Sequence, residues 1–133
     1  MSTKPEIVTP ELLSIVIPVY NEEDNVALLT QKIHESLVDY SYEIIFVNDF
    51  STDQTVQRIK QLKDPLVHLI ELKKNYGQSL ALAAGIDYAH GAYIITMDGD
   101  LQNDPCDIPR MLKVAVEEHY DLVTGIRQKR KDS

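Results

Sequence analysis

Short, almost continuously apolar runs alternate along the chain with stretches in which apolar residues recur every three or four positions. The run from Leu12 to Val19 is rich in β-branched residues, which is typical of a strand buried on both faces. Similar runs at 43–47, 66–72 and 93–97 predict three further strands, and 121–124 begins a fifth. The helical spacing between these runs is carried by Val26, Leu29, Ile33 and Leu37, by Val56, Ile59 and Leu62, and by Ile108, Met111, Leu112 and Ala115.

Polar residues mark the expected beginnings of the helices. We expect Asn21 to cap the first helix, with acidic residues in its first turn, where the helix dipole favours negative charge. Ser51 or Thr52 is expected to cap the second helix. An alanine-rich third helix at 78–89 contains Gly85, at which it is either broken or closely packed.

Strands that alternate with single helices predict an α/β fold. Right-handed crossovers then give a three-layer, Rossmann-like arrangement in which a mainly parallel sheet lies between helices. The length of 133 residues suits one domain. We expect a flexible N-terminal segment at 1–10 and a folded domain at 11–133.

Composition narrows the class of protein. Hydrophobic residues make up 44% of the chain and charged residues 26%, the balance of an ordinary globular protein, and no apolar run approaches the roughly 18 residues of a membrane-spanning helix. The net charge of −8 argues against a nucleic-acid partner, because such binding depends on basic side chains. With Cys106 as the sole cysteine and no Asn-x-Ser/Thr site, the sequence favours a cytoplasmic setting.

Polar residues follow each predicted strand. Because parallel strands end at the same edge of a sheet, where ligands bind in open α/β folds, these residues are expected to converge on one rim. The segments are Tyr20–Glu22, Asn48–Asp49, Lys73–Asn75, Asp98–Gln102 and, after the last strand, Arg127.

Asp98 and Asp100 carry the strongest chemical signal at this rim. Two carboxylates two residues apart can share a hard divalent cation, and such a cation could hold a diphosphate. A calcium-binding loop is a rival interpretation, but Asn103 stands where that loop requires glycine and Pro109 where it requires a bidentate glutamate.

The other rim residues are ambiguous when taken singly. Asp49 is either a turn carboxylate or an acceptor for a base N–H or a ribose hydroxyl. The segment Asn75–Gly77 is equally well explained as a plain turn, and Tyr20–Glu22 as a strand end followed by a helix cap. Their joint placement, rather than any one residue, favours a ligand site.

Taken together, four motifs resemble those of family 2 glycosyltransferases of the GT-A fold. They are SIVIPVYNE at 14–22, VNDFSTD at 47–53, NYG at 75–77 and MDGDLQNDP at 97–105, and they occur in the family's order over nearly the whole chain. The DGDLQ form, with a Gly-x-Arg segment ending at Arg127, is most similar to dolichyl- and undecaprenyl-phosphate sugar transferases. One departure is Asn48, where relatives often have aspartate.

This resemblance implies a site for a nucleotide sugar, either a UDP-sugar or a GDP-sugar. It places Pro18, Tyr20 and Glu22 around the base and ribose, and Asp49 on the base. The segment from Asn75 to Gly77 would belong to the same nucleotide site.

The resemblance also implies a metal and diphosphate site. Asp98 and Asp100 would hold Mg²⁺ or Mn²⁺, with Asp98 also part of the nucleotide site. Asp100, Gln102 and Arg127 would be the catalytic residues, with Gln102 near the acceptor phosphate or the metal and Arg127 near the phosphates.

The implied reaction transfers the sugar with inversion to a polyprenyl phosphate. An ionised acceptor phosphate would require no strong general base, whereas a hydroxyl acceptor would require one. We expect the parent protein to act at the cytoplasmic face of a membrane, and the sequence leaves a homo-oligomer open.

Two other functions remain as alternatives. A receiver-like signalling module is also an α/β chain with acids at strand ends, although it would require an acidic pair after its first strand and a lysine after its last. A non-catalytic nucleotide-binding fragment is the second alternative. The glycosyltransferase interpretation further predicts that residues 11–133 are the donor-binding part of a domain truncated at its C-terminus.

Overall fold

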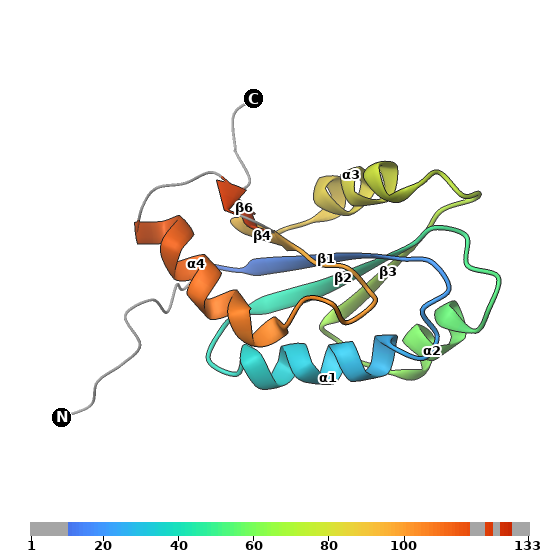
Figure 1. Cartoon of the computed structure of the whole chain (residues 1–133), viewed down its shortest axis with the longest axis horizontal. Helices are drawn as coiled ribbons and strands as arrows, with labels where there is room; N and C mark the ends of the chain where they lie inside the picture. The colour runs from blue at the N-terminus through green and yellow to red at the C-terminus, as the bar shows by residue number, and fades with distance from the viewer. Residues whose placement is uncertain (1–10, 118–121, 124–125, 129–133) are drawn as a thin grey trace.

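The computed structural model of the chain describes residues 11–117, 122–123 and 126–128, so the expected flexible segment 1–10 lies outside the described residues. Its strands are β1 (Leu13–Val19), β2 (Tyr42–Asn48), β3 (Val67–Glu71), β4 (Tyr93–Thr96), β5 (Leu122–Val123) and β6 (Ile126–Gln128). Its helices are α1 (Val26–Ser36), α2 (Thr55–Gln61), α3 (Gln78–Tyr88) and α4 (Ile108–Glu117), the last preceded by the 3₁₀ turn η1 (Pro105–Asp107). Figure 1 shows how these elements follow one another.

The strands form one sheet in the order β3-β2-β1-β4-β6-β5. β1 is at its centre and pairs in parallel with β2, from Leu13 opposite Tyr42 to Val19 opposite Asn48, and with β4 on its other side. β3 pairs in parallel with β2. The predicted α/β fold with a mainly parallel sheet is confirmed.

The C-terminal edge of the sheet differs from the expectation of a fifth parallel strand. β5 and β6 pair with each other in antiparallel fashion, and β6 also pairs antiparallel with β4. A short hairpin therefore completes the sheet. The apolar run at 121–124 predicted the strand but not its direction, because direction depends on the connection and not on the run itself.

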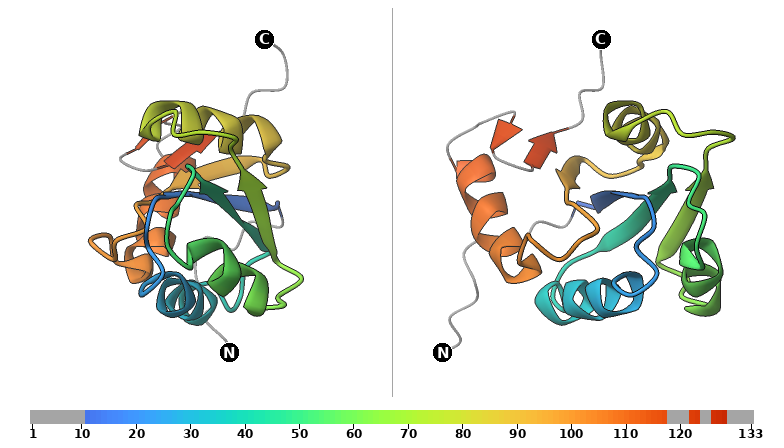
Figure 2. Two further views of the ribbon diagram at one scale, coloured as in Figure 1. Left: turned by 90° about the vertical axis from the view of Figure 1, so that its right-hand side faces the viewer. Right: turned by 45° about the vertical axis from the view of Figure 1, so that its right-hand side comes forward.

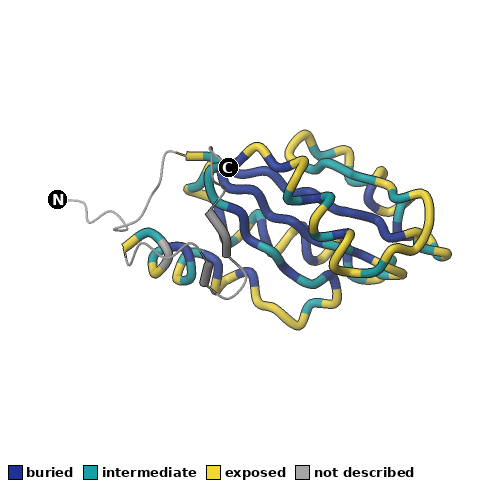
Figure 3. Tube along the Cα trace, turned by 90° about the horizontal axis from the view of Figure 1, so that it is seen from above, coloured by how far each residue is buried: buried dark blue, intermediate teal, exposed yellow. Residues whose placement is uncertain are grey.

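Helices cover both faces of the sheet (Figures 1 and 2). Alternate residues of β1 point to opposite faces, so Ile15 and Ile17 pack in the core beneath α1, α2 and α4, whereas Val16 packs beneath α3. The central strands are buried along their length, and the loops and the outer sides of the helices are exposed (Figure 3). In the described residues, no helix combines the length and the apolar character needed to cross a membrane.

α3 continues through Gly85 and packs closely on the sheet there. A Cβ atom at this position would lie 2.4 Å from Cγ1 of Val16 and 2.9 Å from Cγ2 of Val47. The sequence left open whether the helix is broken or closely packed at Gly85, and the structure shows close packing. This contact sets α3 against the central strands and fixes where its N-terminus meets the rim.

The starts of the first two helices differ from the sequence expectation. α1 begins at Val26, so the prediction that Asn21 caps it is wrong. α2 begins at Thr55, and neither Ser51 nor Thr52 caps it. Local preference suggested these caps, but tertiary hydrogen bonds between the two loops take up the polar groups of all three residues.

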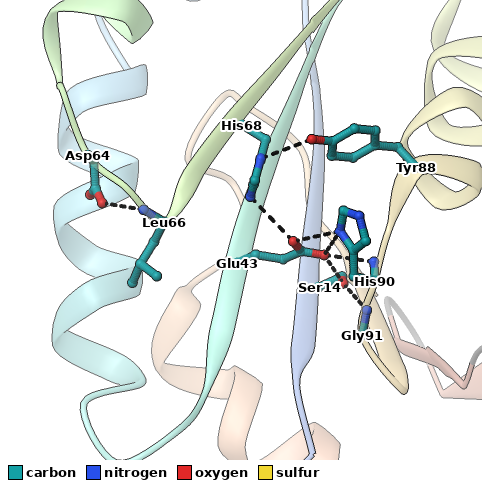
Figure 4. A network of polar contacts seen from close by, with 8 residues as sticks. All are labelled: Ser14, Glu43, Asp64, Leu66, His68, Tyr88, His90 and Gly91. Atoms are coloured by element: carbon teal, nitrogen blue, oxygen red, sulfur yellow. Dashed lines mark hydrogen bonds and ion pairs between the residues drawn. The ribbon is translucent and has the colours of Figure 1, made fainter.

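A polar network fixes the amino ends of β1 and β2 to the turn that precedes β4 (Figure 4). The buried carboxylate of Glu43 accepts hydrogen bonds from the Ser14 hydroxyl (2.7 Å) and the His90 backbone N–H (2.8 Å), and its Oε1 lies 3.4 Å from Nε2 of His68. Burial alone would raise the pKa of Glu43, but the bonds from His90 and Ser14 outweigh it and lower that pKa. Glu43 thus joins β1, β2 and the turn before β4.

Candidate functional site

A cleft of about 310 Å³ lies where β1, β2 and β4 end. Most of the residues that the sequence singled out for nucleotide or metal binding line it. The lining is Pro18, Val19, Tyr20, Glu22, Asp49, Asn75, Gln78, Asp98, Gly99 and Asp100. The structure therefore brings four separate segments of the chain together at one site.

The loops after β1 and β2 are fastened to each other beside this cleft. The Asn21 backbone N–H donates to the Ser51 hydroxyl (2.9 Å), and the Thr52 backbone N–H donates to Oδ1 of Asn21 (2.8 Å). Asn21 has a φ of 55°, a left-handed conformation that asparagine adopts more readily than most residues. Asn21 thus joins the two loops and holds Tyr20 at the cleft.

A second set of bonds holds Glu22 in place. Its backbone N–H donates to the Thr55 hydroxyl (2.8 Å), which itself donates to Oδ1 of Asp53 (2.5 Å), and its carboxylate accepts from the side-chain amide of Asn25 (2.7 Å). Burial raises the pKa of Asp53, but hydrogen bonds from Thr55 and from the backbone of Glu23 outweigh it, so that pKa is lowered. The walls of the cleft are therefore preorganised without a ligand.

Asp49 joins the end of β2 to the loop before α3. Its side chain is buried, with Oδ1 accepting from the Tyr76 backbone N–H (2.7 Å) and Oδ2 from the Gly77 backbone N–H (2.9 Å). Gly77 has a φ of 95°, which favours glycine, and it directly precedes the first residue of α3. Gly77 thus borders the site through its backbone rather than lining the cleft.

Asp98 and Asp100 lie on the loop after β4. Oδ1 of Asp98 accepts from the side-chain amide of Gln78 (3.0 Å), and Oδ1 of Asp100 accepts from the backbone N–H of Gln102 (3.1 Å). Between them, a Cβ atom at Gly99 would lie 2.9 Å from Cγ1 of Val19. Glycine at this position lets the loop approach β1, which places both carboxylates on the cleft.

The donor set of this loop fits a divalent cation that a ligand helps to coordinate. Asp98 and Asp100 supply the carboxylate oxygens that Mg²⁺ and Mn²⁺ prefer. Within the described residues, no group of three or more His, Cys, Asp or Glu side chains could hold a metal by itself. Remaining ligands would have to be oxygens of a diphosphate or of water.

Two predicted catalytic residues are not on this cleft. Gln102 lines a separate cleft of about 470 Å³ between β4 and α4, on the other side of the same loop. Arg127 lies within β6, opposite Ile94 of β4, so the expectation that it follows the last strand at the rim is wrong. The antiparallel direction of β6 is the physical reason. The side chain of Arg127 lies outside the described residues.

Gln78 is a polar lining residue that sequence reasoning missed. It is the first residue of α3, and the sequence predicts only the start of an alanine-rich helix there. The signal that could have found it is position, since the N-terminus of a helix that follows a parallel strand lies at the same rim as the strand ends. Its bond to Asp98 links α3 to the loop after β4.

In an open α/β sheet, a cleft over the carboxyl ends of the strands is the usual place of a ligand site. The sequence model of glycosyl transferase family 2 matches residues 14–133. The chain therefore belongs to glycosyl transferase family 2.

Relatives and solved structures agree with this family. The chain is 42% identical over 125 residues to a dodecaprenyl-phosphate galacturonate synthase of Rhizobium johnstonii, and 43% identical over 126 residues to an undecaprenyl-phosphate 4-deoxy-4-formamido-L-arabinose transferase of Yersinia enterocolitica. These alignments cover 90% and 91% of this chain but only 37% and 38% of the relatives. The chain thus spans little more than a third of their length.

Among solved structures, the chain is similar to a mannosyltransferase of Pyrobaculum calidifontis in complex with GDP-Man and Mn²⁺. The TM-score is 0.70 at 25% identity, over 84% of this chain and 36% of that one. S. aureus TarS in complex with UDP-GlcNAc matches with a TM-score of 0.68 at 23% identity, over 80% of this chain and 32% of that one. The fold is that of the GT-A glycosyltransferases.

Proposed function

We propose that residues 11–133 form the donor-binding part of a glycosyltransferase that moves a sugar from a nucleotide diphosphate to a polyprenyl phosphate. The observation that carries this proposal is the single cleft lined by Pro18, Tyr20, Glu22, Asp98 and Asp100 in a family 2 chain. The names of the Rhizobium and Yersinia relatives support the lipid-phosphate acceptor. Family membership removes the receiver-like alternative.

The nucleotide would lie along the cleft from the β1 and β2 loops to the β4 loop. Tyr20 is 46% exposed and offers an aromatic face and a hydroxyl at the end where Pro18 and Glu22 lie. Asn75 lies on the same cleft and adds an amide that both donates and accepts. These groups suit the base and ribose, whereas the carboxylates at the other end suit a diphosphate only with a cation.

The acidity of the cleft is the strongest argument for that cation. Glu22, Asp49, Asp98 and Asp100 all line it, and a bare diphosphate would be repelled by this charge. Asp98 and Asp100 would hold Mg²⁺ or Mn²⁺. When bound, the cation would neutralise the negative charge that develops on the leaving diphosphate.

The acceptor would approach from the far side of the β4 loop. A phosphate acceptor is ionised at neutral pH and can attack the anomeric carbon directly, which gives inversion without a general base. Gln102, whose side of the loop faces the second cleft, is our candidate for contacting this acceptor. We propose that the parent protein acts at the cytoplasmic face of a membrane, where a lipid phosphate is accessible.

Calorimetric titration of the chain with UDP and with GDP, each with and without Mn²⁺, tests the donor site. We expect one nucleotide to bind and Mn²⁺ to strengthen the binding. Absence of binding by both nucleotides under every metal condition would refute the proposal. An assay of sugar transfer to a polyprenyl phosphate by the full-length parent protein then separates an active transferase from a non-catalytic nucleotide-binding protein.

A further inference from the structure

We propose that Phe50 supplies a second aromatic contact to the base of the donor nucleotide, beside Tyr20. The inference deepens the proposed function and rests on it, because it requires a nucleotide in the cleft over the strand ends. Phe50 lies within the VNDFSTD motif at 47–53, but neither the sequence pattern nor the resemblance to the family assigns it a role.

Phe50 has a left-handed backbone conformation, with a φ of 65°, which a bulky residue rarely adopts. On one side of it, the backbone N–H of Asp49 donates to the carbonyl of Val19 (2.9 Å). On the other side, the backbone N–H of Ser51 donates to Oδ1 of Asn48 (3.2 Å). Backbone strain of this kind persists where the surrounding structure enforces it, and it is concentrated at functional sites. The neighbouring bonds therefore hold position 50 in one strained conformation.

The stability of the fold does not explain an aromatic ring at this position. Phe50 is 51% exposed, whereas Phe46, the other phenylalanine of the chain, is completely buried. An exposed phenylalanine in this conformation costs stability twice, through backbone strain and through contact of apolar surface with water. Glycine would suit the backbone better. A ligand that contacts the ring accounts for its presence.

The ring and Tyr20 come from two loops that are joined side by side. β1 and β2 pair in parallel as far as their last residues, and beyond them the Asn21 backbone N–H donates to the Ser51 hydroxyl (2.9 Å). Tyr20 and Phe50 each directly precede one partner of this bond. Tyr20 is 46% exposed and lines the cleft, and Asp49, the residue before Phe50, lines it as well. Two exposed aromatic residues thus lie on adjacent loops at the end of the cleft proposed for the base.

A nucleobase is the ligand that suits this pair of aromatic residues. Bases stack on aromatic side chains through their flat faces, and this contact tolerates any base because every base has such a face. Phe50 borders the cleft and is not among the residues that line it. Its ring would therefore cover a bound base from the outer side, while the polar lining groups contact the edges of the base.

The Phe50→Gly variant tests the contribution of the ring, with Lys63→Gly as its matched control. Lys63 is also exposed and left-handed, with a φ of 50°, but it lies between α2 and β3, at the edge where the parallel strands begin. With Mn²⁺ present, we expect Phe50→Gly to weaken the nucleotide that binds, UDP or GDP, by about tenfold. Lys63→Gly should leave this affinity unchanged. Calorimetric titration measures both variants.

A tryptophan at the same position reports the contact directly. The chain contains no tryptophan, so Phe50→Trp gives a fluorescence signal from this position alone. We expect Phe50→Trp to retain the affinity that Phe50→Gly loses, and its fluorescence to be quenched when UDP or GDP binds, because the base stacks on the indole. Lys63→Trp, at the opposite edge of the sheet, should show no quenching on nucleotide binding.

Equal nucleotide affinity in Phe50→Gly and in the unchanged chain would overturn the proposal. Unquenched fluorescence of Phe50→Trp with nucleotide bound would overturn it as well. A measurement on the unchanged chain covers the case in which these variants do not fold. With Mg²⁺ in place of the paramagnetic Mn²⁺, nuclear Overhauser effects are expected between the protons of the base and the ring protons of Phe50, and their absence from a complex that forms would contradict the contact.

The outcomes separate this proposal from the donor site itself. If neither UDP nor GDP binds the unchanged chain under any metal condition, the donor-site proposal fails and the role of Phe50 fails with it. If a nucleotide binds but neither its affinity nor its spectra depend on the ring, only the role of Phe50 is refuted.

Discussion

The two ends of the parallel strands use carboxylates in opposite ways. At the amino ends, Glu43 is buried and its oxygens contact Ser14, His68 and His90. At the carboxyl ends, Asp100 is exposed and Asp98 is half-buried, and each accepts one hydrogen bond from a neighbouring amide, from Gln102 and Gln78 respectively. At the amino edge the carboxylate of Glu43 is fully hydrogen-bonded, whereas at the carboxyl edge Asp98 and Asp100 keep acceptor sites available to a ligand.

This difference separates a structural carboxylate from a ligand-binding one. A buried carboxylate must be fully partnered, because leaving it unpaired would cost several kcal/mol, on the order of 3 to 5. An exposed pair that shares a cleft is hydrated at little cost and can exchange water for a cation. Asp49 lies at the carboxyl edge, where it lines the cleft and also accepts two backbone hydrogen bonds.

The largest effect on nucleotide binding is expected from Asp98→Ala combined with Asp100→Ala. The double variant removes both open carboxylates, so the metal-dependent part of nucleotide binding should be lost. We expect the affinity in Mn²⁺ to fall by about 100-fold, or about 2.8 kcal/mol, to the value measured with a chelator. Because neither side chain is buried, thermal unfolding should change little. If nucleotide binding by the double variant still depended on metal, Asp98 and Asp100 would not be the cation ligands, and the carboxyl edge would not differ from the amino edge in this way.

Replacing Glu43 with alanine should instead lower stability and leave nucleotide affinity unchanged. The buried Ser14 hydroxyl and the backbone N–H of His90 would lose their acceptor, so we expect the free energy of unfolding to fall by about 3 kcal/mol. Glu43→Gln keeps the shape and one acceptor, and a smaller loss is expected. Urea denaturation measures both. Nucleotide affinity of the folded chain should stay unchanged, and a specific loss of affinity would show that this edge also serves the ligand.

The pH dependence of stability sharpens the same contrast. Because the pKa of Glu43 is lowered from 4.5 in the folded chain, the unfolded chain takes up this proton at a higher pH than the folded chain does. Its contribution is therefore complete above pH 4.5 and is lost as the pH falls through the lowered pKa. Glu43→Gln should flatten the fall in unfolding free energy between about pH 6 and pH 3. An unchanged slope would mean that the network does not stabilise the charged form.

The sequence predicted the parallel core and much of the cleft for a common physical reason. β-branched runs such as Leu12–Val19 specify buried strands, and parallel strands must end together, which brought Tyr20, Asn75 and Asp98 to one place. The motif spacing could not supply the orientation of Gln102, because that depends on the turn at Leu101, which has a φ of 66°. The side of the loop to which Gln102 points is set by the folded backbone and not by the sequence motif.

Local preferences failed where tertiary contacts compete with them. Asparagine before an acidic stretch is a good helix cap, yet the side chain of Asn21 accepts from Thr52, more than one element away in the chain. The strand at Leu122–Val123 was foreseen, but its hairpin with β6 and the resulting place of Arg127 were not. In both cases the contact that determines the structure involves a residue outside the segment, so the sequence pattern within the segment does not predict it.

The smallest effect is expected from Asn21, which joins two loops through exposed bonds. Asn21→Gly removes the side-chain oxygen that accepts from Thr52 but allows the φ of 55°, whereas Asn21→Ala also disfavours that conformation. We expect unfolding free energy to fall by about 1 kcal/mol in Asn21→Gly and by somewhat more in Asn21→Ala, with a few-fold loss of nucleotide affinity in each. Chemical denaturation and calorimetry measure the two. If affinity falls about 100-fold while stability is unchanged, Asn21 contacts the ligand, and the carboxyl edge contains one anchor fewer than we infer.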